Sequence, residues 1–418
     1  MTDAGAGGGA EEPPRGWLRL LLDPLFGAFF LGRALSSTGI WIHNITSAVL
    51  VFEITRSAFM VGLVSVAQFI PQVLLAAFTG SQADRGNRQR QVVAGRLVVV
   101  AGSGALAVWV GVLGVDAPGT QWAVVASALV VGLGFVTGGP AMHAMVPALV
   151  RPQELASAVT LNMLPVTLSR AVGPAIGAAI ALLAGPAVAF AVAAAGNLAF
   201  VVLLRRLTVP QERRDPAADT SMRAALAHLR ADPTAAVLLL GVAAVGVGSD
   251  PAITLAPAVS AGMGFGTSQT GTFAAAFGAG AGVAFLLIPG LRRLIGLAWS
   301  ATTGLLLLGA GYVGVLAVAT PWGAVPGFAV SGVGMTFAVT GLSALLQQRL
   351  PDHLRGRVMA LWSVGFLGSR PFAAALNGAV ADLVSVGAAL ALVAVLMGAA
   401  SWLCRPGRTG RPLPGAAP

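Results

Sequence analysis

Residues 155–186 read LASAVTLNMLPVTLSRAVGPAIGAAIALLAGP, an apolar stretch with a single charged residue, Arg170. As a helix, this stretch exceeds the roughly 20 residues that cross about 30 Å of hydrocarbon. A guanidinium at the centre of a lipid-facing helix costs from about 3 to more than 10 kcal/mol, so it must face a partner or a water-filled cavity. A second apolar run contains Arg370, in GSRPF at 368–372. The sequence therefore predicts a membrane protein that places an arginine inside the bilayer twice.

The composition supports the same interpretation. The chain has 418 residues, of which 56% are hydrophobic and 10% charged, and its mean hydropathy is +0.84. A soluble domain carries about a quarter charged residues. We predict an all-α membrane protein with twelve transmembrane helices. They are expected at 25–52, 58–80, 91–114, 121–146, 154–184, 186–204, 235–259, 267–290, 295–319, 323–347, 357–381 and 384–404.

The arginines predict the orientation of these spans. With the N-terminus in the cytoplasm, twenty of the 25 basic residues fall in cytoplasmic segments, and Arg56 alone falls in an external loop. Membrane proteins concentrate their positive residues on the cytoplasmic side. We therefore expect a multi-pass protein of the cell membrane with both termini in the cytoplasm. Four arginines lie within predicted spans: Arg33, Arg96, Arg170 and Arg370.

The longest predicted loop lies at the midpoint of the chain and divides it into two halves. We expect a cytosolic tail and interfacial segment at 1–24, a six-helix half at 25–204, a cytoplasmic linker at 205–234, a second six-helix half at 235–404 and a cytosolic tail at 405–418. Within the linker, residues 222–229 suit a helix on the membrane surface, and the first half suits a solvated linker at least as well. Ser169-Arg170 and Ser369-Arg370 stand 200 residues apart, each in the fifth span of its half. Two six-span pseudo-repeats are a transporter architecture.

The loop between the second and third spans reads GSQADRGNRQR, residues 80–90. Its one acid, Asp84, is placed to cap the start of the third span, and its arginines are placed to anchor the loop at the membrane surface. The stretch resembles the loop signature of the major facilitator superfamily, G-x-x-x-D-R-x-G-R-[KR], although Asn87 and Gln89 depart from it. The resemblance implies a latch that holds the start of the eleventh span. The latch residues would be Gly80, Asp84, Arg85 and Arg88, with Arg355 and Arg357 as their partners.

The fifth span contains GPAIGA, residues 173–178. Small residues four apart let helices approach closely, and a proline bends a span. The stretch resembles the motif G-x-x-x-G-P-x-x-G-G of the drug/proton antiporters, with Ser169 and Ala178 replacing two glycines. The resemblance implies that Gly173, Pro174 and Gly177 form a motif of exporters rather than of uptake transporters. The alternative is that these residues serve only helix packing.

Three further stretches resemble the enterobactin-exporter and macrolide-efflux-like branch of the superfamily. They are residues 30–55, 144–162 and 345–363, which lie in both halves. The resemblance implies the major facilitator fold, with two six-helix halves. The fourth span, GLGFVTGGPAMHA at 132–144, lacks the basic residue that the superfamily usually has there.

Asp250 is the one acid that falls well inside a predicted span. It lies at a similar height to Arg170 and Arg370, about 20–22 Å from the inner boundary. In the fold that the resemblance implies, the seventh span packs near the eleventh and the first near the fifth. We therefore expect Asp250 to pair with Arg370, and His43 or Asn44 to support Arg170. The proton-coupling candidates are Asp250, Arg370, Arg170 and His43, and a permanent salt bridge without a transport role is the alternative.

Four polar side chains within the predicted spans are candidates to line a cavity or to bond across helices: Asn44, Gln68, Asn162 and Asn377. A metal site or an enzyme would need clustered His, Asp, Glu or Cys. The chain has four scattered histidines and one cysteine, Cys404, so we expect no metal or other cofactor. The chain has no lysine, which excludes the phosphate-binding loop of a primary pump.

The net charge of +10 does not indicate nucleic-acid binding, because the arginines are spread over many short loops. The predicted function is a secondary active transporter that exports a bulky, partly apolar small molecule such as a drug, macrolide or siderophore. The proton gradient would drive it by alternating access. An uptake permease or facilitator of the same fold is the alternative. The expected partners are the lipid bilayer, the substrate and the proton, and we expect a monomer.

Overall fold

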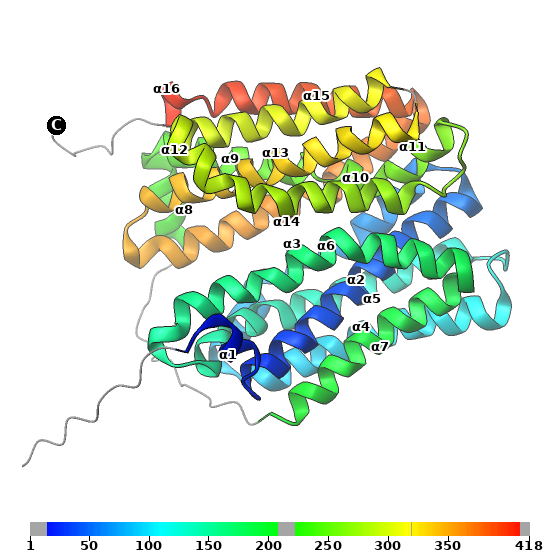
Figure 1. Ribbon diagram of the computed structural model, residues 1–418, viewed down its shortest axis with the longest axis horizontal. Helices are drawn as coiled ribbons and strands as arrows, with labels where there is room; N and C mark the ends of the chain where they lie inside the picture. The colour runs from blue at the N-terminus through cyan, green and yellow to red at the C-terminus, as the bar shows by residue number, and fades with distance from the viewer. Residues whose placement is uncertain (1–14, 208–221, 319, 410–418) are drawn as a thin grey trace, which may run out of the picture.

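The computed structural model describes residues 15–207, 222–318 and 320–409, and the regular secondary structure within these ranges is helical (Figure 1). Within helices, several side chains near residues 76–85 and 352–360 are outside the described set. The first part of the chain forms α1 (Trp17–Leu21), α2 (Phe26–Thr55), α3 (Ala58–Arg85), α4 (Arg88–Leu113), α5 (Thr120–Met145), η1 (Val146–Leu149), η2 (Pro152–Glu154), α6 (Leu155–Ala184) and α7 (Pro186–Arg205).

The second part of the chain begins with a short amphipathic helix, as expected for the linker. It forms α8 (Met222–Ala231), α9 (Pro233–Gly248), α10 (Pro251–Thr254), α11 (Ala256–Gly262), α12 (Thr270–Ala317), α13 (Pro321–Gln348), α14 (Asp352–Leu383), α15 (Val386–Leu403) and α16 (Pro406–Thr409). Within the described residues, ten helical segments are long and apolar enough to cross a membrane.

Three predicted spans differ from the observed helices. The eighth and ninth predicted spans merge into α12, whose 48 residues are interrupted by a non-helical residue, Gly296 (φ 78°, ψ 170°). Glycine adopts this backbone without a Cβ penalty, so it joins two helical arms. The seventh predicted span breaks into α9, α10 and α11 at Asp250 and Leu255, each of which precedes a helix that has proline in its first turn. Proline fits the first turn of a helix and prevents continuation of the preceding one.

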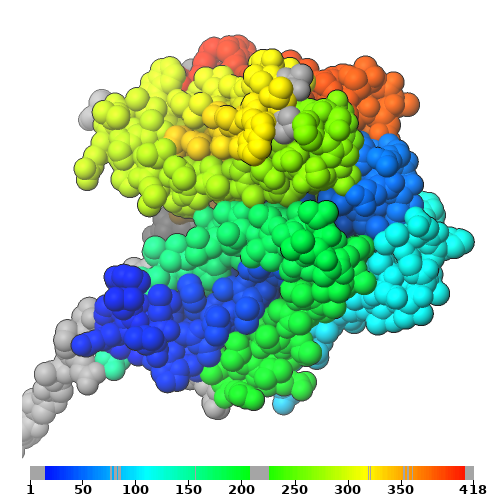
Figure 2. Space-filling view, turned by 45° about the vertical axis from the view of Figure 1, so that its right-hand side comes forward, coloured from blue at the N-terminus to red at the C-terminus, as the bar shows by residue number. Residues whose placement is uncertain are grey.

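The helices form two groups, the first bundle (α2–α7) and the second bundle (α9–α15), which lie one below the other in Figure 1. Helices α3 and α6 of the first bundle pack against α14 and α12 of the second. We call the end that carries α1, α8 and α16 the termini end, and the end that carries α11 the far end. Figure 2 shows a hollow between the bundles that opens toward the termini end.

Within the first bundle, a salt bridge anchors α1 at the termini end. Arg15 donates through Nε to Glu154 Oε1 (2.7 Å) and through Nη2 to Glu154 Oε2 (2.8 Å), and it also contacts Asp23. Asp23 in turn accepts hydrogen bonds from the backbone amides of Leu25 and Phe26 at the start of α2. Hydrogen bonding to Arg15 lowers the pKa of Glu154 to about 2.

The second bundle has its own salt bridge at the termini end. Arg349, which ends α13, donates through Nε to Asp232 Oδ2 (2.7 Å) and through Nη2 to Oδ1 (3.1 Å). Asp232 also caps α9 by accepting from the amide of Thr234. Burial raises the pKa of Asp232, but the hydrogen bonds from Arg349 and the helix start outweigh it and hold this pKa below its usual value. Each of these two salt bridges therefore lies within its own bundle, and neither joins the bundles to one another.

Candidate transport site between the two bundles

Asp250 lies at the break between α9 and α10 and is buried, with 3% of its surface exposed. Its Oδ1 accepts a hydrogen bond from Thr254 Oγ1 (2.9 Å), and its Oδ2 accepts one from Asn377 Nδ2 (2.9 Å). Tyr312 of α12 supports the break by donating to the carbonyl of Gly248 (2.7 Å). The two other buried carboxylates in the described part of the chain, at positions 154 and 232, lie at the termini end. Asp250 is thus held by neutral donors in the middle of the molecule.

The expected ion pair between Asp250 and Arg370 is not formed as a direct contact. The carboxylate is occupied by Thr254 and Asn377, and the Arg370 guanidinium instead lies over the ring of Phe69 (4.8 Å from its Cζ to the ring centroid). Asp250 and Arg370 still interact electrostatically, without a hydrogen bond between them. The prediction that the two charges lie near one another holds, and the prediction of their pairing is wrong in this conformation.

Arg170 also has aromatic partners in place of the expected polar ones. Its guanidinium lies between the rings of Trp41 in α2 and Phe277 in α12, with 5.4 Å from Cζ to each centroid. Neither His43 nor Asn44 contacts it, because both side chains turn toward other helices of the first bundle. The expectation that they support Arg170 is therefore wrong.

Each of the two arginines contacts an aromatic ring of the opposite bundle. Arg370, on α14 of the second bundle, lies over Phe69 of the first, and Arg170, on α6 of the first bundle, lies over Phe277 of the second. A cation over an aromatic face is attracted by about 0.5–2 kcal/mol, the larger value applying where water is excluded. Each of these arginines, Arg370 buried and Arg170 partly buried, therefore joins its own half to the other half, a relation that the sequence repeat alone did not reveal.

His43 is buried and bonded within the first bundle. Its Nδ1 lies 3.1 Å from Ser103 Oγ, its Nε2 lies 3.4 Å from Ser47 Oγ, and its ring lies against Phe190. The structure does not bring it to Asp250 or to either interfacial arginine.

The four polar cavity candidates separate into three places. Asn377 lies in the site, where it donates to Asp250. Gln68 donates to Asn44 Oδ1 (2.9 Å) between α3 and α2. Asn162 is buried in α6. The contacts of Asn377 therefore single it out as part of the site.

The predicted latch is described only in part. The side chains of Gly80, Asp84, Arg85 and Arg355 lie outside the described residues, so their contact stays a prediction. Arg88 donates to the carbonyl of Ala144 (3.1 Å), which ties the loop to α5 of the same bundle. Arg357 is exposed at the start of α14.

The fifth-span motif packs on both sides of α6. A Cβ added to Gly173 would lie 2.5 Å from Trp41 Cβ, and one added to Gly177 would lie 2.7 Å from Ile45, so both glycines allow α2 to approach. On the opposite side, Gly271 of α12 lies against Ala178 and the carbonyl of Pro174. The motif therefore lies at the contact between the bundles.

The sequence interpretation missed a group of contacts that joins the bundles at the far end. Asp382, in the last turn of α14, accepts hydrogen bonds from Ser57 Oγ (2.5 Å) and from the amides of Ala58 (2.8 Å) and Phe59 (3.1 Å). It thus caps the first turn of α3 from the other bundle. Thr267 donates to Glu53 across the same end. Ser57 before an apolar run was a recognisable capping signal, but nothing nearby in sequence indicated its distant acid.

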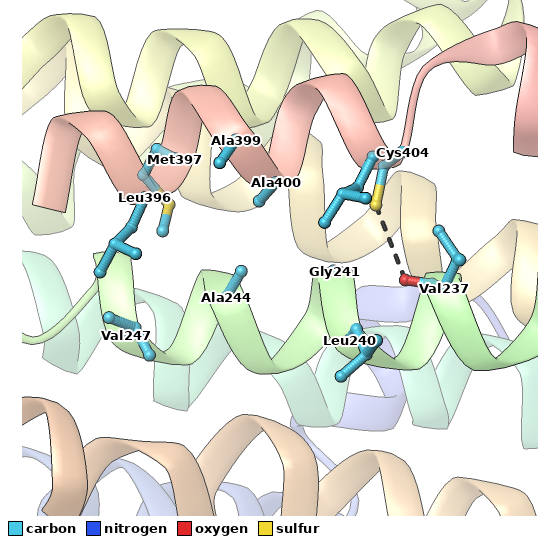
Figure 3. Close-up of a pocket in the computed structure, with 11 residues that line it drawn as sticks. Val237, Leu240, Gly241, Ala244, Val247, Leu396, Met397, Ala399, Ala400 and Cys404 are labelled. Carbon is cyan, nitrogen blue, oxygen red and sulfur yellow. Dashed lines mark hydrogen bonds between the residues drawn. The ribbon is translucent and has the colours of Figure 1, made fainter.

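The described cavities do not lie at the carboxylate of Asp250. A small one of about 10 Å³ adjoins Arg170, Trp41 and Phe277. A larger one of about 250 Å³ lies between α9 and α15 and is lined by apolar side chains (Figure 3). Cys404 closes one end of it, with Sγ directed at the carbonyl of Val237 (3.7 Å). This cysteine is a buried packing residue just after α15.

Several solved transporters share the fold. A nucleoside transporter, NupG, superposes with a TM-score of 0.76 at 11% identity, covering 91% of this chain and 98% of that one. A bacterial homologue of the iron transporter ferroportin, in an inward-facing state, gives 0.70 at 17% identity, covering 93% and 100%. A bacterial homologue of the lysosomal transporter Spinster, inward-facing and occupied, gives 0.72 at 16% identity, covering 91% and 96%. At these identities the similarity concerns the fold.

Sequence comparison is more specific. The enterobactin exporter EntS of Salmonella typhimurium is 28% identical over 381 residues, which is 85% of each chain. The homologous exporter of Salmonella typhi gives the same identity and coverage. Residues 18–406 match the family described as transmembrane secretion effector. The chain is therefore a transporter rather than an enzyme, and it belongs to the transmembrane secretion effector family of the major facilitator superfamily.

Proposed function

We propose that this transporter is a proton-coupled exporter of a bulky, partly apolar small molecule and that it works by alternating access. The two arms of α12 would cross the membrane separately, so that the chain makes twelve crossings in two six-helix halves. Both termini would lie in the cytoplasm, because the arginines gather at the termini end. The proton gradient would supply the energy to a monomer without a resident cofactor.

The observation that carries the proposal is the environment of Asp250. A carboxylate in the interior of a membrane transporter is costly to keep and is characteristic of proton pathways. The Asp250 carboxylate interacts electrostatically with Arg370, which forms no direct ion pair within the described residues. The carboxylate accepts hydrogen bonds from two neutral groups, and these groups can also bond a protonated acid. An amide and a hydroxyl can each donate or accept, whereas a direct guanidinium contact would strongly favour the charged form.

Protonation of Asp250 would act on the interface through Arg370. When Asp250 is ionised, its charge offsets that of the buried guanidinium over Phe69. When it is protonated, the guanidinium is buried without compensation, which is strongly unfavourable. Water reaches Arg370 if α14 separates from α3, so protonation favours opening at the far end. Tyr312 and Arg170 are the other charged or titratable groups that interact with this site.

The observed conformation fits one stage of such a cycle. Asp382 and its partners close the far end, and the hollow between the bundles opens toward the termini end. With the termini in the cytoplasm, this is the state in which a cytoplasmic substrate would bind.

Two observations support a bulky, partly apolar substrate. Trp362 and Phe366 of α14 stack with their ring centroids 5.4 Å apart and are partly exposed. The exporter that is 28% identical over 85% of the chain handles enterobactin by its name. An aromatic surface with few charges suits a large ligand that is bound mainly by apolar contact.

The proposal is tested by proton movement in inside-out vesicles with an acidic interior. A panel of macrolides, siderophores and dyes is added while the gradient is monitored. We expect at least one compound to discharge the gradient with wild type, and Asp250→Asn to slow this at least about tenfold, which corresponds to about 1.4 kcal/mol. Asp116→Asn, which removes an exposed carboxylate, serves as the matched control.

Two outcomes would overturn parts of the proposal. Equal discharge by Asp250→Asn and wild type would make Asp250 structural. Passage of a labelled compound without any discharge would identify a facilitator or uptake permease of the same fold instead of a proton-coupled exporter.

A further inference from the structure

Two more arginines are buried in the interior of the first bundle, away from the contact between the bundles. Arg33 of α2 is 2% exposed and Arg96 of α4 is 1% exposed. Each lies seven or eight residues from the start of its helix at the termini end, about 10–12 Å along the helix axis. They are close enough to act on each other electrostatically. The bundle therefore buries two positive charges at one level.

Most of the donors of these two guanidinium groups are unpartnered. Nε and Nη1 of Arg33 and Nε and Nη2 of Arg96 are buried without a hydrogen-bond acceptor. Among the described residues, Arg96 Nη1 donates to Ser36 Oγ (3.0 Å), which itself donates to Asn197 Oδ1 (2.7 Å). Arginine cannot release its proton in a protein. Neutralisation by proton loss, which a buried lysine can use, is therefore not open to this pair.

The described residues supply no negative charge to the pair. Neither arginine takes part in a salt bridge with a described carboxylate, and neither lies over a described aromatic ring. The other titratable group that interacts with them is His143, near the end of α5, which is not an anion. Buried charges in proteins are paired or bind an ion of opposite sign. The arrangement lacks an anion.

The helices around the pair are packed closely against one another. Each arginine follows a glycine at a close helix contact. A Cβ at Gly32 would lie 2.3 Å from Phe200, and one at Gly95 would lie 2.6 Å from the carbonyl of Gly134. These contacts hold α7 and α5 against the helices that carry the arginines. Packing this close argues for a small inorganic ion at the pair rather than an organic ligand.

We propose that Arg33 and Arg96, with Ser36, form a binding site for a small inorganic anion of chloride or phosphate size. The anion enters from the termini end and remains inside the first bundle, where it joins α2 to α4. The site is separate from Asp250 and does not depend on the proposed transport function. Two cations with fork-shaped donors suit an anion that accepts several hydrogen bonds at once.

The experiment measures thermal unfolding of the full-length protein in nanodiscs of neutral lipid. Sodium chloride or sodium phosphate replaces sodium gluconate at constant ionic strength. We expect the unfolding midpoint of wild type to rise saturably by about 2 °C or more with chloride or phosphate. Arg96→Gln should lose this rise, and Arg205→Gln, which removes an exposed charge from the same bundle, should retain it. Equal responses in wild type and Arg96→Gln would overturn the proposal.

A direct binding measurement covers the case in which Arg96→Gln does not fold. Equilibrium dialysis of wild type with radioactive chloride, and separately with radioactive phosphate, is expected to give about one bound ion per chain for at least one of them. Competition by the unlabelled ion but not by gluconate identifies a specific site. Binding of neither ion up to about 100 mM would contradict the inference.

Discussion

The two contacts between the bundles, α3 with α14 and α6 with α12, contain the same type of interaction in different surroundings. At each, an arginine of one bundle lies over a phenylalanine of the other. At the α3–α14 contact, Arg370 has an acid nearby, and Asp382 caps α3 from across the interface. At the α6–α12 contact, Arg170 has a second aromatic ring in place of an acid, and small residues bring the backbones together.

In the proposed function, this difference would give the two contacts different tasks. The charge on Arg170 is permanent and has aromatic partners, so the α6–α12 contact would depend on helix packing alone. The charge beside Arg370 would depend on whether Asp250 is protonated, so the α3–α14 contact would respond to pH. A transporter that couples a proton to a change of conformation needs one contact of the second kind.

Substitution of the two arginines should distinguish the two contacts, and we expect it to have the largest effect on transport. Arg370→Gln leaves Asp250 buried without its compensating charge, so we expect proton-coupled transport to fall at least about tenfold. Arg170→Gln removes only aromatic contacts, and we expect a loss of about threefold or less. Transport assays in vesicles at matched expression check the comparison, and equal losses would refute the assignment.

Removal of the far-end cap should give the next largest effect. Asp382→Ala removes three hydrogen bonds between the bundles, and loss of a helix cap alone costs about 1 kcal/mol. We expect the fraction of molecules open at the far end to rise about fivefold or more, measured by thiol labelling of a cysteine introduced at Ala58, which is buried at this contact and bonds Asp382 only through its backbone amide. Asp382→Asn, which keeps one acceptor oxygen, should change labelling less. An unchanged rate in Asp382→Ala would show that the cap does not hold the bundles.

The aromatic partners should contribute smaller and unequal effects. Phe69→Leu removes a cation–π contact worth about 0.5–2 kcal/mol. Its effect should depend on the state of Asp250, because both act on Arg370. We expect Phe69→Leu and Asp250→Asn to be non-additive in transport rate, and Phe277→Leu and Asp250→Asn to be additive. A double-mutant cycle measures each combination.

The anchor of α1 should respond to acid with the smallest effect. The pKa of Glu154 is lowered to about 2, so the anchor contributes stability above the usual carboxyl pKa near 4.5. That stability is lost as the pH falls from about 4.5 toward 2. We expect hydrogen exchange in α1 to accelerate over this range in wild type. In Glu154→Gln the exchange should be fast already at neutral pH, and protection equal to wild type there would contradict the role of the anchor.

The sequence predicted the general architecture because hydropathy and arginine position act over whole spans. The predicted spans agree with the helices to within a few residues for α2, α6 and α7, and the interruption at Asp250 follows from its flanking prolines. The burial of Arg370 was predictable because a charge in an apolar run needs a non-lipid environment.

The contacts across the interface could not be predicted in the same way. The chain has 18 phenylalanines, and nothing local marks Phe69 or Phe277 as the one that meets an arginine. Asp382 lies at the end of a span, where a carboxylate is expected to be solvated, and its partners are more than 300 residues away. The expected pair of Asp250 and Arg370 failed because Asn377 and Thr254 reach the carboxylate first.

In the proposed function, the protonation state of Asp250 sets which end of the molecule is open. The most direct test is the distance between spin labels at both ends of one protein. A far-end pair at Trp122 and Trp322 and a termini-end pair at Arg205 and Leu294 use exposed positions in different bundles. Cys404 is buried and is replaced by serine in every variant.

When the pH is lowered from about 8 to about 5, we expect the far-end distance of wild type to lengthen and the termini-end distance to shorten. Asp250→Asn should show the low-pH distances at both pH values. A wild type whose distances do not change, or an Asp250→Asn variant that responds to pH as wild type does, would contradict the account.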